Sequence, residues 1–278
     1  MKLTIRGHNL DLSPGAGRIM GIINVTPDSF SDGGEFTTTD AIASQGRQML
    51  EAGVDIIDIG GESSRPFAKP VELQEELSRV IPAIKILRSQ SSTIPISIDT
   101  TKAEVARQAI KAGADIINDI SALRFDADML EVARSQAAPI IIMHMQGRPE
   151  NMQVNPVYND IIQDTLHFFR KRLKWLTANG IAPEKIIIDP GIGFGKSLRH
   201  NLTILNRLQD YQELGCPVLI GHSRKSFMTG VSGENIDRDC ATAVIAALCV
   251  ERGAAVIRVH NVKKSKEAVR LTQAIQTI

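Results

Sequence analysis

The sequence lacks the features that would direct it to a membrane, to nucleic acid or to a disulfide-rich fold. Its formal net charge is only +1, so we expect no general attraction to nucleic acid or anionic lipid. It has no apolar run long enough to span a bilayer and no secretory signal pattern. Its three cysteines form no CxxC pair, which is typical of a reducing compartment. We therefore expect a cytoplasmic protein without nucleic-acid or membrane partners.

Two motifs that would indicate a zinc or nucleotide site are also missing. His144, His222 and His260 have neither HxH nor HExxH spacing, so they do not indicate zinc. The segment PGIGFGKS at residues 190–197 resembles a phosphate-binding loop, but Pro190 stands where that motif requires Gly. We interpret the segment as a flexible connection between a strand and a helix that could still approach a ligand closely.

No linker rich in Ser, Pro or Gly divides the chain. Its 278 residues would suit two small domains or one α/β barrel of about 250 residues, and the 43% of hydrophobic residues are enough for a large core. Because the composition is uniform along the chain, we expect a single domain over residues 1–278.

Three segments share one pattern, EAGVDIIDIG at 51–60, KAGADIINDI at 111–120 and RGAAVIRVH at 252–260. Each has a Gly where a helix would need a left-handed C-terminal cap, then a β-branched run, then a polar residue. Before the second segment, Thr101 and Glu104 have the spacing of a capping box at a helix start. The pattern predicts helix-to-strand junctions.

Eight apolar runs of β-forming residues recur, each followed by a helical pattern, as in a parallel sheet covered by helices. They lie near residues 19–23, 55–59, 94–98, 115–117, 139–143, 185–188, 217–220 and 255–259. A single (β/α)8 TIM barrel is the simplest α/β architecture. An open doubly wound sheet is the alternative, but no nucleotide-type glycine fingerprint follows the first run. Residues 1–17 could form a β-hairpin that closes the bottom of the barrel.

Polar side chains follow all eight runs. The carboxyl ends of barrel strands face one mouth, where active sites lie. Strand ends are also polar simply because they meet solvent, and for any one position this explanation is equally good. As a set, however, acidic and amide groups end the second, third, fourth and sixth runs, whereas basic groups follow the last two. The set therefore favours a functional site.

This separation of charge predicts a ligand with two unlike ends. Asp99, Asn118 and Asp189 could bind a flat heterocycle with several N–H donors. Arg258 and His260, with Arg65 as a further candidate, could hold an anion, most simply phosphate.

Eight motifs resemble, in the same order, those of the dihydropteroate synthase family. They are GIINVTPDSFSDGG, DIGGESSRP, SIDTTKAEV, IINDI, MHMQG, IDPGIGFGK, GHSRKSF and RVH, and the likeness spans about residues 19–263. The resemblance implies that 6-hydroxymethyl-7,8-dihydropterin pyrophosphate condenses with p-aminobenzoate to give 7,8-dihydropteroate and pyrophosphate, with Mg²⁺ as cofactor. It also implies a homodimer and a target for sulfonamides.

The resemblance further assigns roles to residues at the mouth. It implies Asp99, Asn118, Asp189 and Lys225 for pterin; Ser64, Arg65, Arg258 and His260 for pyrophosphate; Phe30, Ser64, Arg65, Pro66 and Ser226 for p-aminobenzoate; and Asn24 for the metal. The residues implied to be catalytic are Asp99, Lys225, Arg258 and His260. The C–O bond to pyrophosphate is expected to break first, leaving a pterin cation that a carboxylate stabilises. The loop NVTPDSFSDGG is expected to be a lid.

Three positions depart from the family pattern. Ser64 stands where Thr is usual and keeps the hydroxyl. Phe67 stands where Gly is usual, and we expect its ring to crowd the p-aminobenzoate entrance. Asn261 replaces an Asp that usually follows the His, which changes a partner expected for His260.

Two other functions remain open. The pterin-binding barrels of methyltetrahydrofolate methyltransferases share the Asp and Asn contacts, but a methyl transfer does not need the pyrophosphate-binding residues Arg258 and His260. A non-catalytic pterin-binding paralogue is the second alternative. Release of pyrophosphate when both substrates are supplied would distinguish a synthase from these alternatives.

Overall fold

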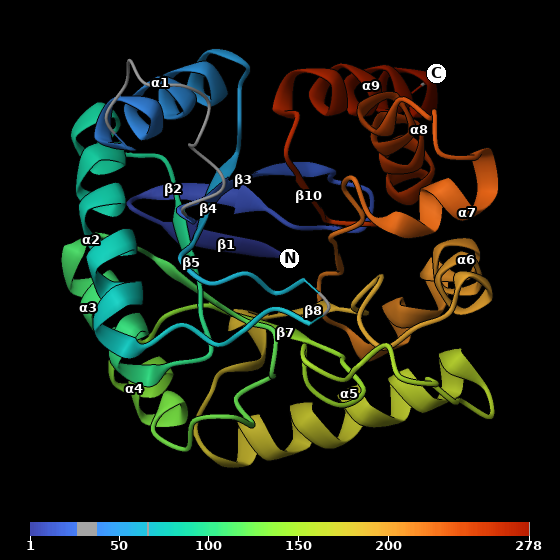
Figure 1. Cartoon of the computed structure of the whole chain (residues 1–278), viewed down its shortest axis with the longest axis horizontal. Helices are drawn as coiled ribbons and strands as arrows, with labels where there is room; N and C mark the ends of the chain where they lie inside the picture. The colour runs from blue at the N-terminus through green and yellow to red at the C-terminus, as the bar shows by residue number, and fades with distance from the viewer. Residues whose placement is uncertain (27–37, 66, 278) are drawn as a thin grey trace.

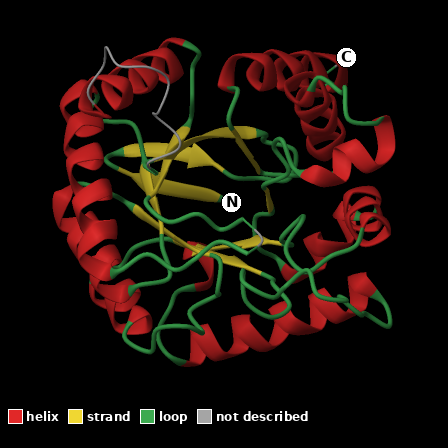
Figure 2. Ribbon diagram, in the orientation of Figure 1, coloured by secondary structure: helices red, strands yellow, loops and turns green. Residues whose placement is uncertain are grey.

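The computed structural model describes residues 1–26, 38–65 and 67–277. Eight parallel strands form a sheet that nearly closes into a barrel, in the hydrogen-bonded order β8-β7-β6-β5-β4-β3-β10-β9. A parallel bridge between Ile188 in β8 and Val218, just before β9, joins the two edges. Helices surround the sheet (Figure 1, Figure 2). The predicted TIM barrel is confirmed.

The strands follow the expected apolar runs closely. The barrel strands are β3 Arg18–Asn24, β4 Ile56–Gly60, β5 Ile96–Asp99, β6 Ile116–Asp119, β7 Ile140–Met143, β8 Ile186–Asp189, β9 Leu219–Ile220 and β10 Val256–Val259. The α-helices are α1 Thr38–Glu51, α2 Leu73–Gln90, α3 Ala103–Ala112, α4 Met129–Ser135, α5 Ile161–Ala178, α6 Leu198–Asn206, α7 Thr229–Ser232, α8 Arg238–Glu251 and α9 Val262–Gln276. Short 3-10 helices are η2 Pro183–Lys185, η3 Leu208–Leu214 and η4 Ser226–Met228. None of the described helices has both the length and the apolar character that a membrane span requires.

The helix-to-strand junctions contain the predicted glycine caps. Gly113 ends α3 with a φ of 118°, a left-handed conformation that favours glycine, and its N–H bonds back to the helix. Gly53 and Gly253 also have positive φ. The predicted capping box before α3 is wrong, because the helix begins at Ala103 and its first N–H donates to the Asp126 carboxylate instead.

The N-terminal strands β1 Lys2–Ile5 and β2 His8–Asp11 form an antiparallel hairpin. Leu3, Ile5 and Leu12 pack in one buried cluster with inward-facing residues at the amino ends of the barrel strands. Those barrel residues include Met20, Ile56, Ile116, Ile141, Ile187, Leu219 and Val256. The hairpin therefore closes the barrel floor, as predicted. Beside it, Arg6 and Arg88 both pair with Asp115, at 2.7 and 2.9 Å.

Candidate active site

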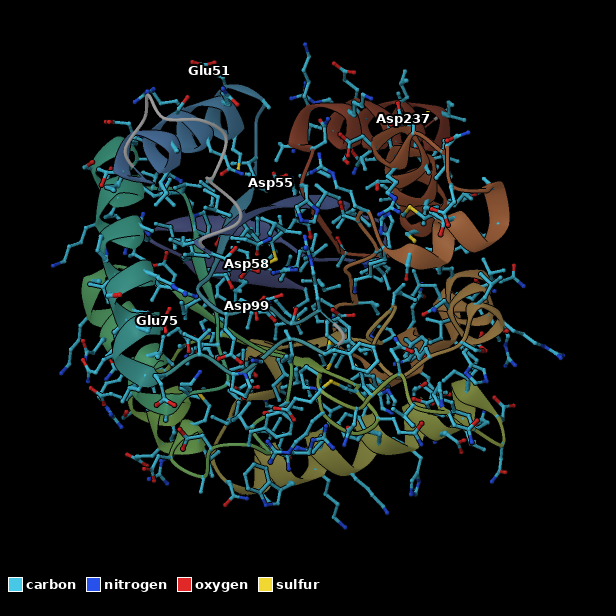
Figure 3. All side chains as sticks on the ribbon, viewed as in Figure 1. Glu51, Asp55, Asp58, Glu75, Asp99 and Asp237 are labelled. Atoms are coloured by element: carbon cyan, nitrogen blue, oxygen red, sulfur yellow. The ribbon has the colours of Figure 1, made fainter. Side chains whose placement is uncertain are left out.

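Arg258, near the end of β10, is the centre of a hydrogen-bonded group inside the mouth. Its Nε donates to Asp58 Oδ2 and its Nη2 to Asp99 Oδ2, each over 2.6 Å. Asn118 Nδ2 donates to the same oxygen of Asp58 over 3.2 Å. Asp58 and Asp99 lie near each other in the middle of the barrel (Figure 3). Strands β4, β5, β6 and β10 thus direct these four side chains to one place.

Asp58 had no assigned role in the sequence interpretation, yet it joins Arg258 to Asn118. It is fully buried, and its second oxygen, Oδ1, has no hydrogen-bond partner among the described residues. Buried polar atoms are usually bonded, and an unpaired one at a strand end indicates a place for a ligand donor or a water. The available signal was a carboxylate inside an otherwise apolar β run.

Asp189 and Lys225 are close enough for their charges to interact, and both bond to the Gly-rich segment 190–197. Asp189 Oδ1 accepts from the Gly191 N–H over 2.8 Å. The Lys225 ammonium donates a hydrogen bond to the Ile192 carbonyl oxygen, and its Nζ lies 4.3 Å from the centre of the Phe194 ring. The cation–π contact adds Phe194, which the sequence interpretation did not single out, to the site.

Burial changes the proton affinities of these charged groups. It raises the pKa of Asp99 to about 7, although the Arg258 guanidinium opposes that rise, and it raises the pKa of Asp189. It lowers the pKa of Lys225 to about 8, against the attraction of Asp189. An acid and a base that both titrate near neutral pH are typical of an active site.

His260 follows β10 and lies beside Ser223 rather than within the Arg258 group. Ser223 Oγ is 2.9 Å from His260 Nδ1 and accepts the His260 backbone N–H. Burial, together with the charges of Arg224 and Arg258, lowers the pKa of His260 to about 3. A bound anion would raise that pKa again. Asn261 does not bond to His260: it caps α9 and donates to Asp239.

Three of the residues predicted for p-aminobenzoate, Ser64, Arg65 and Ser226, lie in connections that follow barrel strands. Ser64 is half-buried and Arg65 is exposed in the connection after β4, and Ser226 begins η4. Arg65 is close enough to His260 for its charge to lower the histidine pKa. Phe30 and Pro66 lie outside the described residues, as does most of the predicted lid.

Phe67 in the same connection has a φ of 63°, which L-residues rarely adopt, and its side chain is 68% exposed. Its N–H donates to the Pro149 carbonyl oxygen over 3.1 Å. The connection after β4 is therefore hydrogen-bonded to the connection after β7. A cavity of about 370 Å³ lies between these connections, and Ser63, Lys102 and Arg148 are among its lining residues.

The group around Asn24 is suited to a magnesium ion. Asn24 Oδ1 and Asp99 Oδ2 each lie 3.8 Å from the point that a Cβ on Gly60 would occupy, so a side chain at residue 60 would contact both oxygens and glycine leaves that position unfilled. Amide and carboxylate oxygens are the ligands that Mg²⁺ prefers, and the ion usually retains waters or substrate phosphates as well. The described residues contain no cluster of three or more His, Cys, Asp or Glu that could hold a metal, so substrate oxygens would have to complete the coordination.

Comparisons with known proteins agree with this geometry. A family model described as pterin binding enzyme matches residues 20–260. Over 275 residues the chain is 45% identical to dihydropteroate synthase of Haemophilus influenzae, covering 99% of this chain and 98% of the relative. It is also 45% identical to the Synechocystis enzyme over 259 residues, covering 92% and 89%. The chain belongs to the dihydropteroate synthase family.

Solved structures give the same result over the whole chain. The Yersinia pestis dihydropteroate synthase with a sulfonamide drug complex has a TM-score of 0.92 and 42% identity, with both chains fully covered. The Xanthomonas albilineans enzyme with 4-aminobenzoic acid has a TM-score of 0.91 and 40% identity, covering 100% of this chain and 98% of that one. The same enzyme in complex with 7,8-dihydropteroate has a TM-score of 0.89 and 39% identity, with both chains fully covered.

Proposed function

We propose that the chain catalyses the condensation of 6-hydroxymethyl-7,8-dihydropterin pyrophosphate with p-aminobenzoate, giving 7,8-dihydropteroate and pyrophosphate. The observation that supports this most strongly is the group of carboxylates, an amide and cations gathered at the mouth. Carboxylate and amide groups of Asp99, Asn118 and Asp189 lie near the cations of Arg258 and Lys225. Relatives that match nearly the whole chain are dihydropteroate synthases, and one of them has been solved with dihydropteroate.

The pterin ring would occupy the pocket between Asp99, Asn118 and Asp189. Carboxylates accept the ring N–H donors, and an amide both donates and accepts. Lys225 would donate to the ring carbonyl or stack its charge over the ring. Because Asp58 already bonds to Asn118, the amide is held in one orientation before a ligand arrives.

Arg258 would change partners when the pyrophosphate end binds. In the structure its guanidinium is shared by Asp58 and Asp99. A pyrophosphate group is a stronger bidentate partner than a single carboxylate and would compete for the guanidinium. His260, with Ser64 and Arg65 in the connection after β4, would complete the anion site.

The proposed reaction breaks the C–O bond between the pterin methylene and pyrophosphate first. The electron pair leaves with pyrophosphate, and the positive charge spreads over the methylene and the dihydropterin ring. The Asp99 carboxylate, partly released from Arg258, stabilises that cation, and Arg258 stabilises the departing anion. The amine of p-aminobenzoate then attacks the methylene and loses a proton. Phe30, Ser64, Arg65, Pro66 and Ser226 are the residues proposed to bind p-aminobenzoate.

Asn24, together with Asp99, would hold Mg²⁺. The ion would neutralise charge on the pyrophosphate. Its role stays a proposal, and removal of divalent cations with a chelator should lower the rate of pyrophosphate release if the assignment holds.

We also propose a cytoplasmic homodimer. Exposed apolar residues on α6, α7 and α8 support the dimer, and these helices lie on the same side of the barrel (Figure 1). The residues are Leu198 and Leu202 on α6, Val231 on α7, and Val244 and Leu248 on α8. Sedimentation equilibrium should give twice the monomer mass, and a single-chain mass at micromolar concentration would refute the dimer.

Pyrophosphate release with Mg²⁺, measured with and without p-aminobenzoate alongside mass detection of dihydropteroate, tests the function. Release coupled to dihydropteroate formation is expected. Pterin binding without release would favour the non-catalytic paralogue. Methyl transfer from methyltetrahydrofolate would favour the methyltransferase alternative. The sulfonamide complex of the Yersinia relative supports a further expectation, that sulfonamides compete with p-aminobenzoate for this chain.

A further inference from the structure

The Gly-rich segment 190–197 between β8 and α6 is fixed by side chains along its length. Four consecutive carbonyl oxygens, from Ile192 to Gly195, each accept a hydrogen bond from a different side chain. The pairs are Lys225 to Ile192, Gln153 to Gly193 at 2.6 Å, Lys196 to Phe194 at 3.0 Å and Tyr158 to Gly195 at 2.8 Å. The sequence predicted a flexible connection here, whereas these bonds specify one backbone shape.

Other parts of the chain supply most of these contacts. Gln153 and Tyr158 belong to the connection between β7 and α5, and Asn201 of α6 accepts the Gly193 N–H over 2.7 Å. The ammonium of Lys196 is 3.0 Å from His144 Nδ1 and also donates to the His144 carbonyl oxygen. Lys196 is only 3% exposed, and burial lowers its pKa to about 7. The segment is thus attached to the carboxyl end of β7 and to α6.

Close packing requires glycine at two positions of the segment. A Cβ at Gly191 would lie 2.1 Å from the His144 carbonyl oxygen, and one at Gly195 would lie 2.9 Å from that of Gln146. Both glycines have positive φ. Backbone therefore packs directly on backbone at two points, and only glycine fits there.

The segment in turn sets the positions of two groups assigned to the pterin site. Gly191 donates its N–H to Asp189, and the Ile192 carbonyl oxygen accepts from Lys225. The Phe194 ring lies under the Lys225 ammonium, 4.3 Å away. Neither Gln153 nor Tyr158 donates to Asp189 or Lys225 itself, so any effect on these groups passes through the backbone of the segment.

We propose that segment 190–197 is a preformed template for the pterin pocket, and that Gln153 and Tyr158 are positioning residues that hold Lys225 and Asp189 in place through it. The proposal rests on the proposed function in naming the ligand as a pterin. A template that is ordered before binding reduces the entropy lost on binding. Loss of either donor leaves a carbonyl oxygen without its partner and lets the segment adopt other shapes.

The two tyrosines of the chain provide a matched test. Tyr158→Phe removes only the hydroxyl that bonds to the segment. Tyr211→Phe removes a comparable hydroxyl, which bonds to Thr165 in α5 over 2.6 Å and does not contact the segment. The measurements are calorimetric affinity for 6-hydroxymethylpterin, KM for p-aminobenzoate, and melting temperature.

We expect Tyr158→Phe to weaken pterin binding about tenfold, which corresponds to about 1.4 kcal/mol, with little change in KM for p-aminobenzoate. Gln153→Met, which keeps side-chain length but removes the donor, should have the same effect. Tyr211→Phe should lower the melting temperature and leave pterin affinity unchanged.

If the native chain binds pterin and both Tyr158→Phe and Gln153→Met bind it with unchanged affinity, the template proposal fails. The proposed function would not be affected by that result. Parallel loss of pterin affinity in Tyr158→Phe and Tyr211→Phe would also overturn the template proposal, because the effect would then reflect general stability. If the native chain binds no pterin, the proposed function fails together with the template.

Discussion

The floor and the mouth of the barrel are made by the same strands but have opposite chemistry. Side chains alternate along a strand, so residues two apart both face the interior, about 7 Å from each other. The floor and mouth partners on four strands are Ile56 and Asp58, Ile116 and Asn118, Ile187 and Asp189, and Val256 and Arg258. The floor residues join the hairpin in one apolar cluster, whereas their partners are charged or polar groups of the mouth.

The contrast between floor and mouth indicates which end of the barrel stabilises the molecule. The mouth concentrates buried charge, and burial raises the pKa of Asp99 and lowers that of Lys225, so both charged forms are disfavoured by their surroundings. Such a site is expected to reduce stability in exchange for function. The apolar floor has to offset that loss. Substitutions at the mouth should therefore change mainly the kinetic constants, and substitutions at the floor should change mainly the free energy of unfolding.

The largest effect is expected from Asp99→Asn at the mouth. The substitution keeps the shape but removes the charge that stabilises the pterin cation, and Arg258 retains Asp58 as a partner. We expect kcat to fall about 100- to 1,000-fold, with a smaller rise in KM for the pterin substrate. Steady-state assays of pyrophosphate release check this. Equal losses in both parameters, or an unchanged kcat, would refute the assigned role.

At the floor, Leu12→Ala should lower stability and leave catalysis nearly unchanged. Leu12 is 1% exposed, and its loss opens a cavity beneath the barrel. We expect the free energy of unfolding to fall by about 2 kcal/mol, near the low end for a buried Leu because the hairpin can partly relax. Denaturant titration measures the loss, and kcat should stay within a factor of two of the native value. A large fall in kcat at native stability would mean that floor and mouth are coupled.

The pH dependence should originate at the mouth. The Asp99 pKa is raised from its usual 3.8 to about 7 and that of Lys225 is lowered to about 8. If catalysis needs the carboxylate and the ammonium, kcat/KM should be bell-shaped with limbs near these values. Asp99→Asn should remove the acid limb, and a native-like acid limb in that variant would assign the limb to another group.

The same shift predicts how Asp99 affects stability. Between about pH 4 and 7 the folded chain retains a proton that the unfolded chain releases, so the contribution of Asp99 to the free energy of unfolding falls as pH rises. Asp99→Asn should flatten this part of the curve. Urea titrations of both proteins at several pH values provide the comparison.

The smallest effect is expected in the connection after β4, from Phe67→Gly. Glycine adopts a φ of 63° without strain but gains entropy in the unfolded chain, so the two terms should nearly cancel in stability. If the Phe67 ring crowds the p-aminobenzoate entrance, the affinity of a sulfonamide relative to p-aminobenzoate should change a few-fold. Similar ratios in the native chain and the variant would count against crowding.

The barrel itself could be predicted because its signals are local. Apolar runs, and glycine caps such as Gly113, need only a few neighbouring residues, and parallel strands bring their carboxyl ends to one mouth whatever the loops do. The capping box before α3 failed for the opposite reason. The helix N-terminus is capped by Asp126, which is contributed by a different connection.

The sequence does not show which side chains bond to one another within the site. Asp58 and Arg258 are 200 residues apart, and no local pattern indicates that they pair. Similarly, the glycines of segment 190–197 suggested flexibility, whereas donors from Gln153 and Tyr158 fix it. Residue types could be assigned to the mouth, but which side chain bonds to which depends on tertiary contacts.

The measurement that tests the central claim most directly is a single-turnover experiment on the native chain, Asp99→Asn and Asp115→Asn, with pyrophosphate and dihydropteroate followed together. Asp115 is the matched control, because it is an ion-paired carboxylate at the floor. The account predicts equal amounts of both products at the same rate in the native chain and Asp115→Asn, and a rate about 100-fold lower in Asp99→Asn. Equal rates in the native chain and Asp99→Asn, or the same loss in both variants, would contradict it.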